Sequence, residues 1–293
     1  MNRRHFLALT SAAIAAHSVF AQGKKKPLFE ISLAQWSNHR MLKEGKLDNL
    51  DWPEYTKKTY DIHALEYVNQ FFKDKADDEA YLADLNTRVS DLGMTNLLIM
   101  IDGEGHIGAK TDKKRKKTVD KHKRWVTAAK TLGCHSIRVN AHGEGSPQEA
   151  AKRVGDGLHK LASFAATHEI NVLVENHGGN SSNGKWLSEV LASVNLSNCG
   201  SLPDFGNFHK YDRYQGLRDL MPFAKGVSAK SRVFDEDGNE TQTDFSQAMD
   251  LVLSANYHGY VGIEYEGRKR SEDDGVLLTK ALLEKIRTEY KTY

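Results

Sequence analysis

The feature that most constrains this chain is a regular alternation of short apolar runs with longer amphipathic segments. Apolar residues recur at helical spacing between the runs, as in 76–93, 146–169 and 243–259, and a last amphipathic segment covers 273–290. Parallel strands need a crossover helix, so strict alternation predicts a parallel sheet. Eight strand–helix units favour a single (β/α)8 barrel over an open doubly wound sheet, and no G-x-G-x-x-G follows the first strand. The eight predicted strands are 29–37, 62–72, 95–103, 136–143, 170–179, 199–207, 224–234 and 260–267.

The N-terminus has the features of an export signal. Arg3 and Arg4 form a twin-arginine pair, Phe6 to Ala16 is a short apolar stretch, and small residues precede a cleavage point after Ala21. The stretch is too short and too rich in alanine for a comfortable membrane span, although an N-terminal anchor helix is the alternative. We expect residues 1–21 to be a twin-arginine signal peptide, 22–26 a linker and 27–293 the barrel. The mature protein would then be extracytoplasmic, for example periplasmic, without stable membrane insertion.

The charge of the sequence narrows the classes of molecule that the protein can bind. The sequence has 41 Lys and Arg against 39 Asp and Glu, a near balance that argues against nucleic acid as the main partner. The basic run 110–124 lacks interleaved aromatic residues, so we expect it to be the solvated face of a helix.

Cys134 and Cys199 each precede an apolar strand, where a small buried thiol is expected. An oligomer is possible.

Polar residues end the predicted strands, and in a (β/α)8 barrel the active site lies at the carboxyl ends of the strands. The fifth strand shows this best, because an apolar run passes directly into Glu175, Asn176 and His177 and then into two glycines. Polar residues are common in any loop, but here polar residues follow all eight predicted strands, so a site at the barrel mouth is the better explanation. Beside the carboxylates, the residues that we take as site candidates are Trp36, Glu66, Asn140, His142, His177, Asn207, His209 and Lys230.

Three carboxylates form the strongest subset. Glu175, Asp204 and Glu264 each stand where an apolar run ends, and together at one barrel mouth they would repel one another unless a cation held them. Oxygen ligands suit Mn²⁺, Mg²⁺ or Co²⁺, and a histidine in the set would widen the choice to Zn²⁺ or Fe²⁺. The alternative is that each carboxylate pairs with a basic residue such as Lys230 or Arg138.

At these positions the chain resembles the xylose isomerase-like barrel proteins, often named sugar phosphate isomerases/epimerases. The segments that carry the resemblance are "VLVENHGG" (172–179), "LPDFGNFH" (202–209) and "GIEYEG" (262–267), which look like the family's fifth, sixth and eighth strand ends. The resemblance implies that Glu175, Asp204 and Glu264 bind a divalent metal and that the two glutamates also transfer protons. Glu264 is preferred to Glu266 because it directly follows the apolar run.

The chain departs from the family's pattern at two ligand positions. The family has V-H-x-K-D at its seventh strand, whereas this chain has "VSAKS" (227–231), with Ser228 in place of the histidine. Asn207 stands where the family tends to have another histidine. His142, His177 or His209 could compensate, water could fill the vacancy, or Lys230 could act as a catalytic amine or cation.

The expected function is a divalent-metal-dependent sugar isomerase or epimerase. A metal on adjacent hydroxyl and carbonyl oxygens acidifies the carbon-bound proton, which a carboxylate can then remove. Glu175, Glu264, Lys230 and His142 are the catalytic candidates, and the other candidates would bind a non-phosphorylated sugar, the form expected outside the cytoplasm. A keto-glycoside lyase or hydratase using the same site is one alternative, and a non-catalytic sugar-binding barrel is the other.

Overall fold

The protein, described by a computed structural model over residues 27–290, is built on one sheet of eight parallel strands. The proposed signal peptide and linker lie outside the described residues. Each predicted strand segment contains one observed strand, so the predicted alternation is confirmed. The strands are β1 (Glu30–Ala34), β2 (Ala64–Val68), β3 (Thr95–Met100), β4 (Ser136–Asn140), β5 (Asn171–Glu175), β6 (Cys199–Leu202), β7 (Val227–Ser231) and β8 (Tyr260–Tyr265).

The sheet curls into a nearly closed barrel. Its strands run in the order β6-β5-β4-β3-β2-β1-β8-β7, so β6 and β7 meet at the seam. There the pairing is reduced to isolated parallel bridges between Ser201 and Ala224 and between Asp204 and Ser228. The Ser228 amide donates to the Pro203 carbonyl at 2.9 Å, and the Phe205 amide donates to the Ser228 carbonyl at 3.0 Å. These bonds hold the loop after β6 against β7, and that loop carries Asp204.

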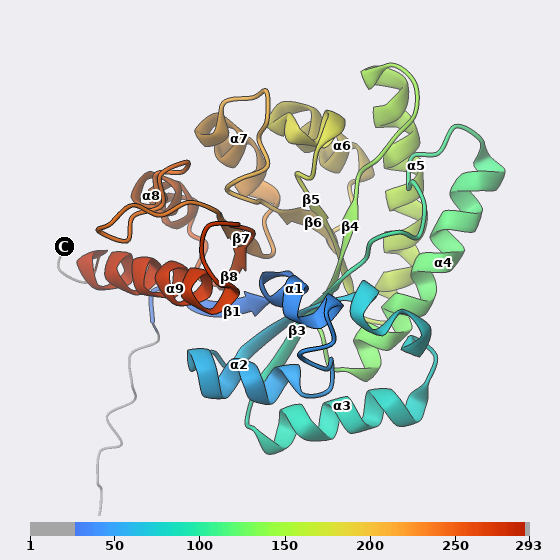
Figure 1. Cartoon of the computed structure of the whole chain (residues 1–293). Helices are drawn as coiled ribbons and strands as arrows, with labels where there is room; N and C mark the ends of the chain where they lie inside the picture. The colour runs from blue at the N-terminus through green and yellow to red at the C-terminus, as the bar shows by residue number, and fades with distance from the viewer. Residues whose placement is uncertain (1–26, 291–293) are drawn as a thin grey trace, which may run out of the picture.

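Helices surround the barrel on its outer face (Figure 1). Local signals set several helix ends: Ser146 caps the helix that begins at Pro147 in a reciprocal capping box with Glu149, and Gly93 and Gly133 follow the ends of two other helices with positive φ. The helices are α1 (His39–Lys43), α2 (Trp52–Tyr60), α3 (Glu79–Asp91), α4 (Asp112–Thr131), α5 (Pro147–Ala166), α6 (Gly184–Val194), α7 (Arg213–Leu220), α8 (Phe245–Ser254) and α9 (Glu272–Glu289).

The core has two parts of unequal size. The larger part fills the space between the sheet and the helices, where alternate strand residues such as Val172 and Val174 point outward. The smaller part lies inside the barrel and consists of Ala34, Val68, Leu98, Met100, Leu173 and Leu202. Many of the remaining inward positions on the strands hold polar or charged side chains, which is what allows a site to form inside the mouth.

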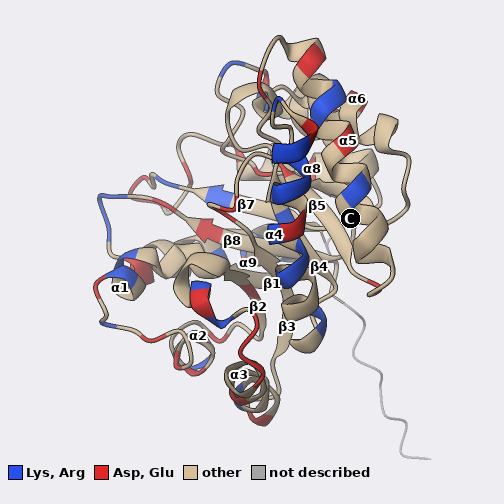
Figure 2. Cartoon of the chain, turned by 90° about the vertical axis from the view of Figure 1, so that its right-hand side faces the viewer, with Lys and Arg blue, Asp and Glu red and all other residues tan. Residues whose placement is uncertain are grey.

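Two further sequence predictions are confirmed. The basic run lies on α4, where Lys113, Lys114, Lys116 and Lys117 are exposed, and Figure 2 shows basic residues along this helix. Cys134 and Cys199 are buried free thiols. Within residues 27–290, no helix has both the length and the apolar character needed to span a bilayer.

Candidate active site

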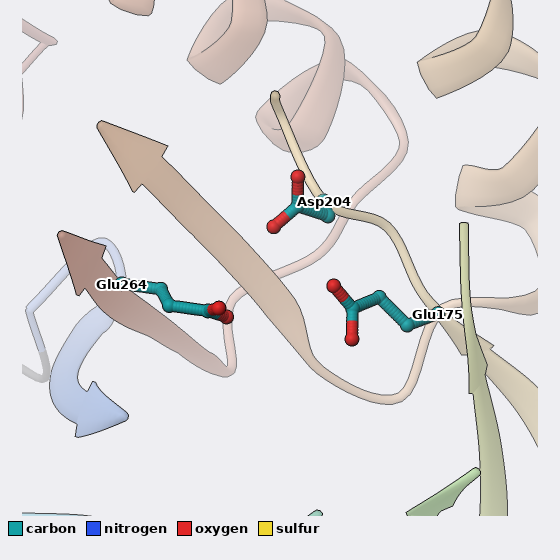
Figure 3. Close-up of side chains that lie close together, drawn as sticks. All are labelled: Glu175, Asp204 and Glu264. Atoms are coloured by element: carbon teal, nitrogen blue, oxygen red, sulfur yellow. The ribbon is translucent and has the colours of Figure 1, made fainter. Parts of the chain in front are cut away.

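Three buried carboxylates meet at the carboxyl ends of the strands. Glu175 is the last residue of β5, Asp204 lies in the loop after β6, and Glu264 is on β8. Their exposed fractions are 0%, 0% and 2%, and one oxygen of each lies within 4.8 Å of one oxygen of the others. Figure 3 shows the three side chains converging from separate elements on one space. The sequence analysis predicted this convergence, and we call the three residues the carboxylate triad.

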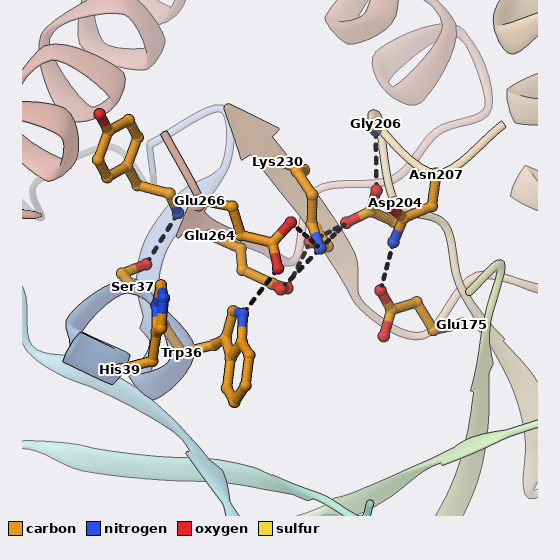
Figure 4. A network of polar contacts seen from close by, with 12 residues as sticks. Trp36, Ser37, His39, Glu175, Asp204, Gly206, Asn207, Lys230, Glu264 and Glu266 are labelled. Carbon is orange, nitrogen blue, oxygen red and sulfur yellow. Dashed lines mark hydrogen bonds and ion pairs between the residues drawn. The ribbon is translucent and has the colours of Figure 1, made fainter. Parts of the chain in front are cut away.

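Two cations contact the triad, as the ion-pair alternative predicted. Lys230 Nζ on β7 lies 2.8 Å from Glu264 Oε1 and 3.7 Å from Asp204 Oδ2, and Figure 4 shows the ammonium between these carboxylates. Arg138 Nε on β4 lies 2.8 Å from Glu175 Oε2. That contact is an ion pair without hydrogen-bond alignment, because neither atom has a hydrogen-bond partner among the described residues. The triad and its ion pairs therefore coexist, with three carboxyl groups against two cations.

The electrostatics show that the two cations do not fully compensate the triad. Burial raises the pKa of Glu175 to about 8, and the lowering by Arg138 and Lys230 does not offset it. Burial also raises the pKa of Asp204 to about 6, against the lowering by Lys230, while Glu264 adds repulsion. For Lys230, burial opposes the charged form, but the surrounding carboxylates outweigh it and raise its pKa above the ordinary value. The ammonium is thus charged, and the raised pKa values of Glu175 and Asp204 show that the triad is costly to ionise fully without a further cation.

Amide and hydroxyl groups orient the triad. Asn207 donates from Nδ2 to Glu175 Oε1 at 3.0 Å. Asn176 makes two bonds to the backbone of Asp204, donating to its carbonyl at 3.0 Å and accepting from its amide at 2.7 Å. Ser228 Oγ lies 2.8 Å from Asp204 Oδ2 and 3.2 Å from Glu264 Oε2. The position where the resemblance implies a histidine therefore presents a hydroxyl oxygen to two members of the triad.

Glu266 lies beside the triad and links it to the surface. Its carboxylate accepts from Trp36 Nε1 at 2.7 Å and from Arg232 Nη2 at 3.0 Å, and it lies 3.4 Å from Lys230 Nζ. Burial raises its pKa, but Lys230, Arg232 and Trp36 outweigh this and lower it to about 2. A cavity of about 680 Å³ opens next to it, with Trp36, Arg232 and Glu266 in its wall. The geometry places Glu264 rather than Glu266 in the triad.

Asn140, His142 and His177 do not contact the triad through any hydrogen bond among the described residues. Asn140 donates to Asp102 Oδ1 at 2.7 Å. His142 is half-buried, its ring centroid lies 5.4 Å from that of His106, and burial lowers its pKa. His177 is also half-buried. Burial is the main cause that lowers its pKa to about 4, and the positive charges of Arg138 and Lys230 contribute to the lowering.

His209 and Glu66 differ from their predicted places. His209 is exposed in the loop after β6, so the structure does not bring it to the triad. Glu66 is in the middle of β2 rather than at its end, fully enclosed, and accepts from Ser32 Oγ at 2.5 Å. Burial raises the pKa of Glu66 to about 7. We correct its placement from the mouth to the interior of the barrel below it.

Asp102 and Arg232 were not among the predicted site residues, and Arg138 was named only as a possible ion-pair partner of a carboxylate. Arg138 donates to Asp102 Oδ1 at 2.9 Å, and Arg138 and Asn140 lower the pKa of Asp102 to about 2 against the effect of burial. The available signal was the position of Arg138 inside an apolar strand, on the same face as Asn140. A charged residue at such a position has to find a buried partner.

Comparisons with known proteins agree with this architecture. Residues 58–288 match the model of the family described as "Xylose isomerase-like TIM barrel". No curated protein shows significant sequence similarity to the chain.

Solved structures with the same fold include sugar epimerases. The apo form of 3-keto-D-glucoside 4-epimerase, YcjR, from E. coli superposes with a TM-score of 0.67 and 19% identity, covering 89% of this chain and 99% of that one. D-psicose 3-epimerase crystallised in the presence of D-fructose gives 0.70 and 13%, covering 88% and 99%. The IOLI protein with a bound zinc atom gives 0.71 and 14%, covering 89% and 99%. At these identities the similarity establishes the fold, and together with the family match it shows that this chain belongs to the xylose isomerase-like TIM barrel family.

Proposed function

We propose that this protein is a divalent-metal-dependent isomerase or epimerase of a sugar derivative, acting by proton transfer next to a carbonyl group. The observation that carries the proposal is the carboxylate triad, three buried acids whose oxygens lie within 4.8 Å of one another at the barrel mouth. Isolated buried carboxylates are costly, and three of them together are more so. A bound cation would relieve this cost.

The residues present fit a divalent cation. Glu175 Oε2 is buried without a hydrogen-bond donor among the described residues, and the triad has one more carboxyl group than there are cations paired with it. The donor atoms at hand are carboxylate oxygens and the Ser228 hydroxyl, with no imidazole nitrogen in the group. An all-oxygen set suits Mn²⁺ or Mg²⁺ better than Zn²⁺. We therefore propose Glu175, Asp204 and Glu264 as the ligands and Mn²⁺ or Mg²⁺ as the preferred ions.

When bound, such an ion would polarise the carbonyl and hydroxyl oxygens of the substrate and so acidify the hydrogen on the carbon between them. Glu175 and Glu264 would remove and return that proton, because they approach from β5 and β8, strands separated by β6 and β7 around the barrel. Arg138 and Asn207 fix the two oxygens of Glu175. Lys230, held at Glu264, would stabilise negative charge that develops on the substrate oxygen.

The carbon and the face to which the proton returns decide which product forms. Return to the opposite face of the same carbon is epimerisation, and return to the neighbouring carbon is isomerisation. Loss of a substituent next to the new carbanion gives the lyase alternative from the same first step. The sugar epimerases among the structural relatives agree with the first two outcomes.

Solvent deuterium exchange tests the proposal. Incubation of the protein and Mn²⁺ in deuterated buffer with 3-keto-glucosides and ketohexoses should put deuterium on the carbon next to the carbonyl, seen by NMR or mass spectrometry. General acid–base catalysis contributes about 10²–10⁴-fold, so Glu175→Gln or Glu264→Gln should cost at least that much. Glu189→Gln, the same change at an exposed position on α6, is the matched control. A substrate that is turned over without deuterium uptake and without an eliminated product would exclude the proposed chemistry.

A further inference from the structure

The cavity beside Glu266 has a strongly cationic wall. It has a volume of about 680 Å³, which lies in the range of small-molecule sites. Glu266 is the only acidic residue among those that line it. The wall contains the aromatic rings of Trp36 and His39 and the charged residues Arg40, Arg232, Glu266, Arg268 and Lys269. Four cations against one carboxylate give this cavity a positive character that the sequence analysis did not anticipate.

The four cations differ in how far the protein already satisfies them. Arg40 donates to the carbonyl oxygens of Gly267 at 2.9 Å and of Arg270 at 3.2 Å, so its role is largely structural. The Arg232 side chain makes two hydrogen bonds, to Glu266 and Asn207, and both come from Nη2.

Arg268 and Lys269 are exposed, and neither has a hydrogen-bond or ion-pair partner among residues 27–290. Within the described part of the chain, Arg268, Lys269 and the Nη1 and Nε groups of Arg232 are thus donors without an acceptor.

The cavity is connected to the triad through one carboxylate. Glu266 contacts Trp36 and Arg232 in the cavity wall on one side and Lys230 on the other, as Figure 4 shows for Trp36 and Lys230. Lys230 in turn contacts Glu264 of the triad at 2.8 Å. A continuous chain of contacts therefore runs from Arg232 in the cavity wall through Glu266 and Lys230 to Glu264 of the triad.

We propose that the substrate is an anionic sugar derivative, whose carboxylate or phosphate group binds in this cavity to Arg232, Arg268 and Lys269. A phosphate would depart from the non-phosphorylated sugar that the export signal leads us to expect. This inference rests on the proposed function, since it assumes that the triad holds the reacting end of the same molecule. Guanidinium groups present a planar fork that matches the oxygens of either anion, and charge-assisted bonds of this kind are stronger than neutral ones. A neutral sugar would leave these donors with water alone.

Equilibrium titration of matched sugar pairs tests the proposal without turnover. The probes are D-glucuronate against D-glucose for the carboxylate, and D-glucose 6-phosphate against D-glucose for the phosphate, each followed by calorimetry at low and at high salt. We expect at least one anionic sugar to bind about tenfold more tightly than glucose, a preference that salt weakens. The anion with the larger preference identifies the group. Equal affinity within both pairs overturns the inference.

Variants locate the effect. The double variant Arg268→Gln/Lys269→Gln should remove most of the preference for the anionic sugar while leaving the binding of glucose unchanged. Lys116→Gln/Lys117→Gln removes the same charge from the exposed face of α4 and should change neither. An unchanged preference in the first double variant contradicts the assignment. Selective anion binding without deuterium exchange would refute the proposed function alone, and exchange without charge preference would refute the anion site alone.

Discussion

Replacing Lys230 by Met removes the ammonium of the site while keeping most of the volume of the side chain. In the wild type Nζ lies 2.8 Å from Glu264, 3.4 Å from Glu266 and 3.7 Å from Asp204, and the side chain is 1% exposed. Removing one partner of a buried ion pair costs about 3–5 kcal/mol, because the other charge stays buried and unpaired. For a domain of this size that loss corresponds to a fall in Tm of roughly 10 °C.

The assay is thermal unfolding of wild type and Lys230→Met with a chelator and with Mn²⁺. The chelated variant should show the full loss. Mn²⁺ should raise the Tm of the variant more than that of the wild type, because the ion then replaces the positive charge that Lys230 places beside Glu264 and Asp204. Lys152→Met, at an exposed position on α5, controls for the change of residue type. If chelated Lys230→Met unfolds at the wild-type temperature, or if Mn²⁺ stabilises both proteins equally, the electrostatic reasoning is wrong.

Three other predictions test the surroundings of the site and the N-terminus. Arg138 lowers the folded-state pKa of Asp102 from 3.8 to about 2, so this carboxylate contributes stability above pH 4 that is lost as the pH falls toward 2. Asp102→Asn should therefore cost about 2 kcal/mol at pH 7 and little at pH 2, measured by urea unfolding; equal loss at both pH values would refute the pairing. Ser228→His adds a nitrogen donor beside Asp204 and Glu264 and should shift metal preference toward Zn²⁺ in competition titrations; an unchanged preference would argue against a role for this position. Replacing Arg3 and Arg4 together by Lys should trap the precursor in the cytoplasm of an exporting host, and unchanged export would refute the twin-arginine signal.

The sequence predicted those features that depend on local pattern. A run of β-branched residues that passes directly into a carboxylate fixed both the strand and the side of the barrel to which Glu175 belongs. The same pattern selected Asp204 and Glu264, and the period of two along β8 places Glu264 and Glu266 on one face, which left the choice between them to the structure.

Features that depend on how strands are staggered could not be predicted. The pairing of β2 with β3 shifts at Leu65 and Glu66, and the end of β2 extends beyond Glu66, so a carboxylate expected at the mouth lies inside the barrel. Which carboxylate each arginine contacts, Glu175 for Arg138 and Glu266 for Arg232, depends on residues more than thirty positions apart. The conformation of the loop after β6 decides that Asn207 points at Glu175 while His209 is exposed.

The most direct test of the central claim is calorimetric titration of the chelated protein with Mn²⁺. We predict one ion per chain in the wild type and in the control Glu189→Gln. Glu175→Gln, Asp204→Asn and Glu264→Gln should each lower the affinity by at least roughly tenfold, and a double variant should lose less than the sum, because contacting residues that share one ligand act as a unit. No binding by the wild type, or binding that survives all three substitutions unchanged, would contradict the claim that these three carboxylates form one metal site.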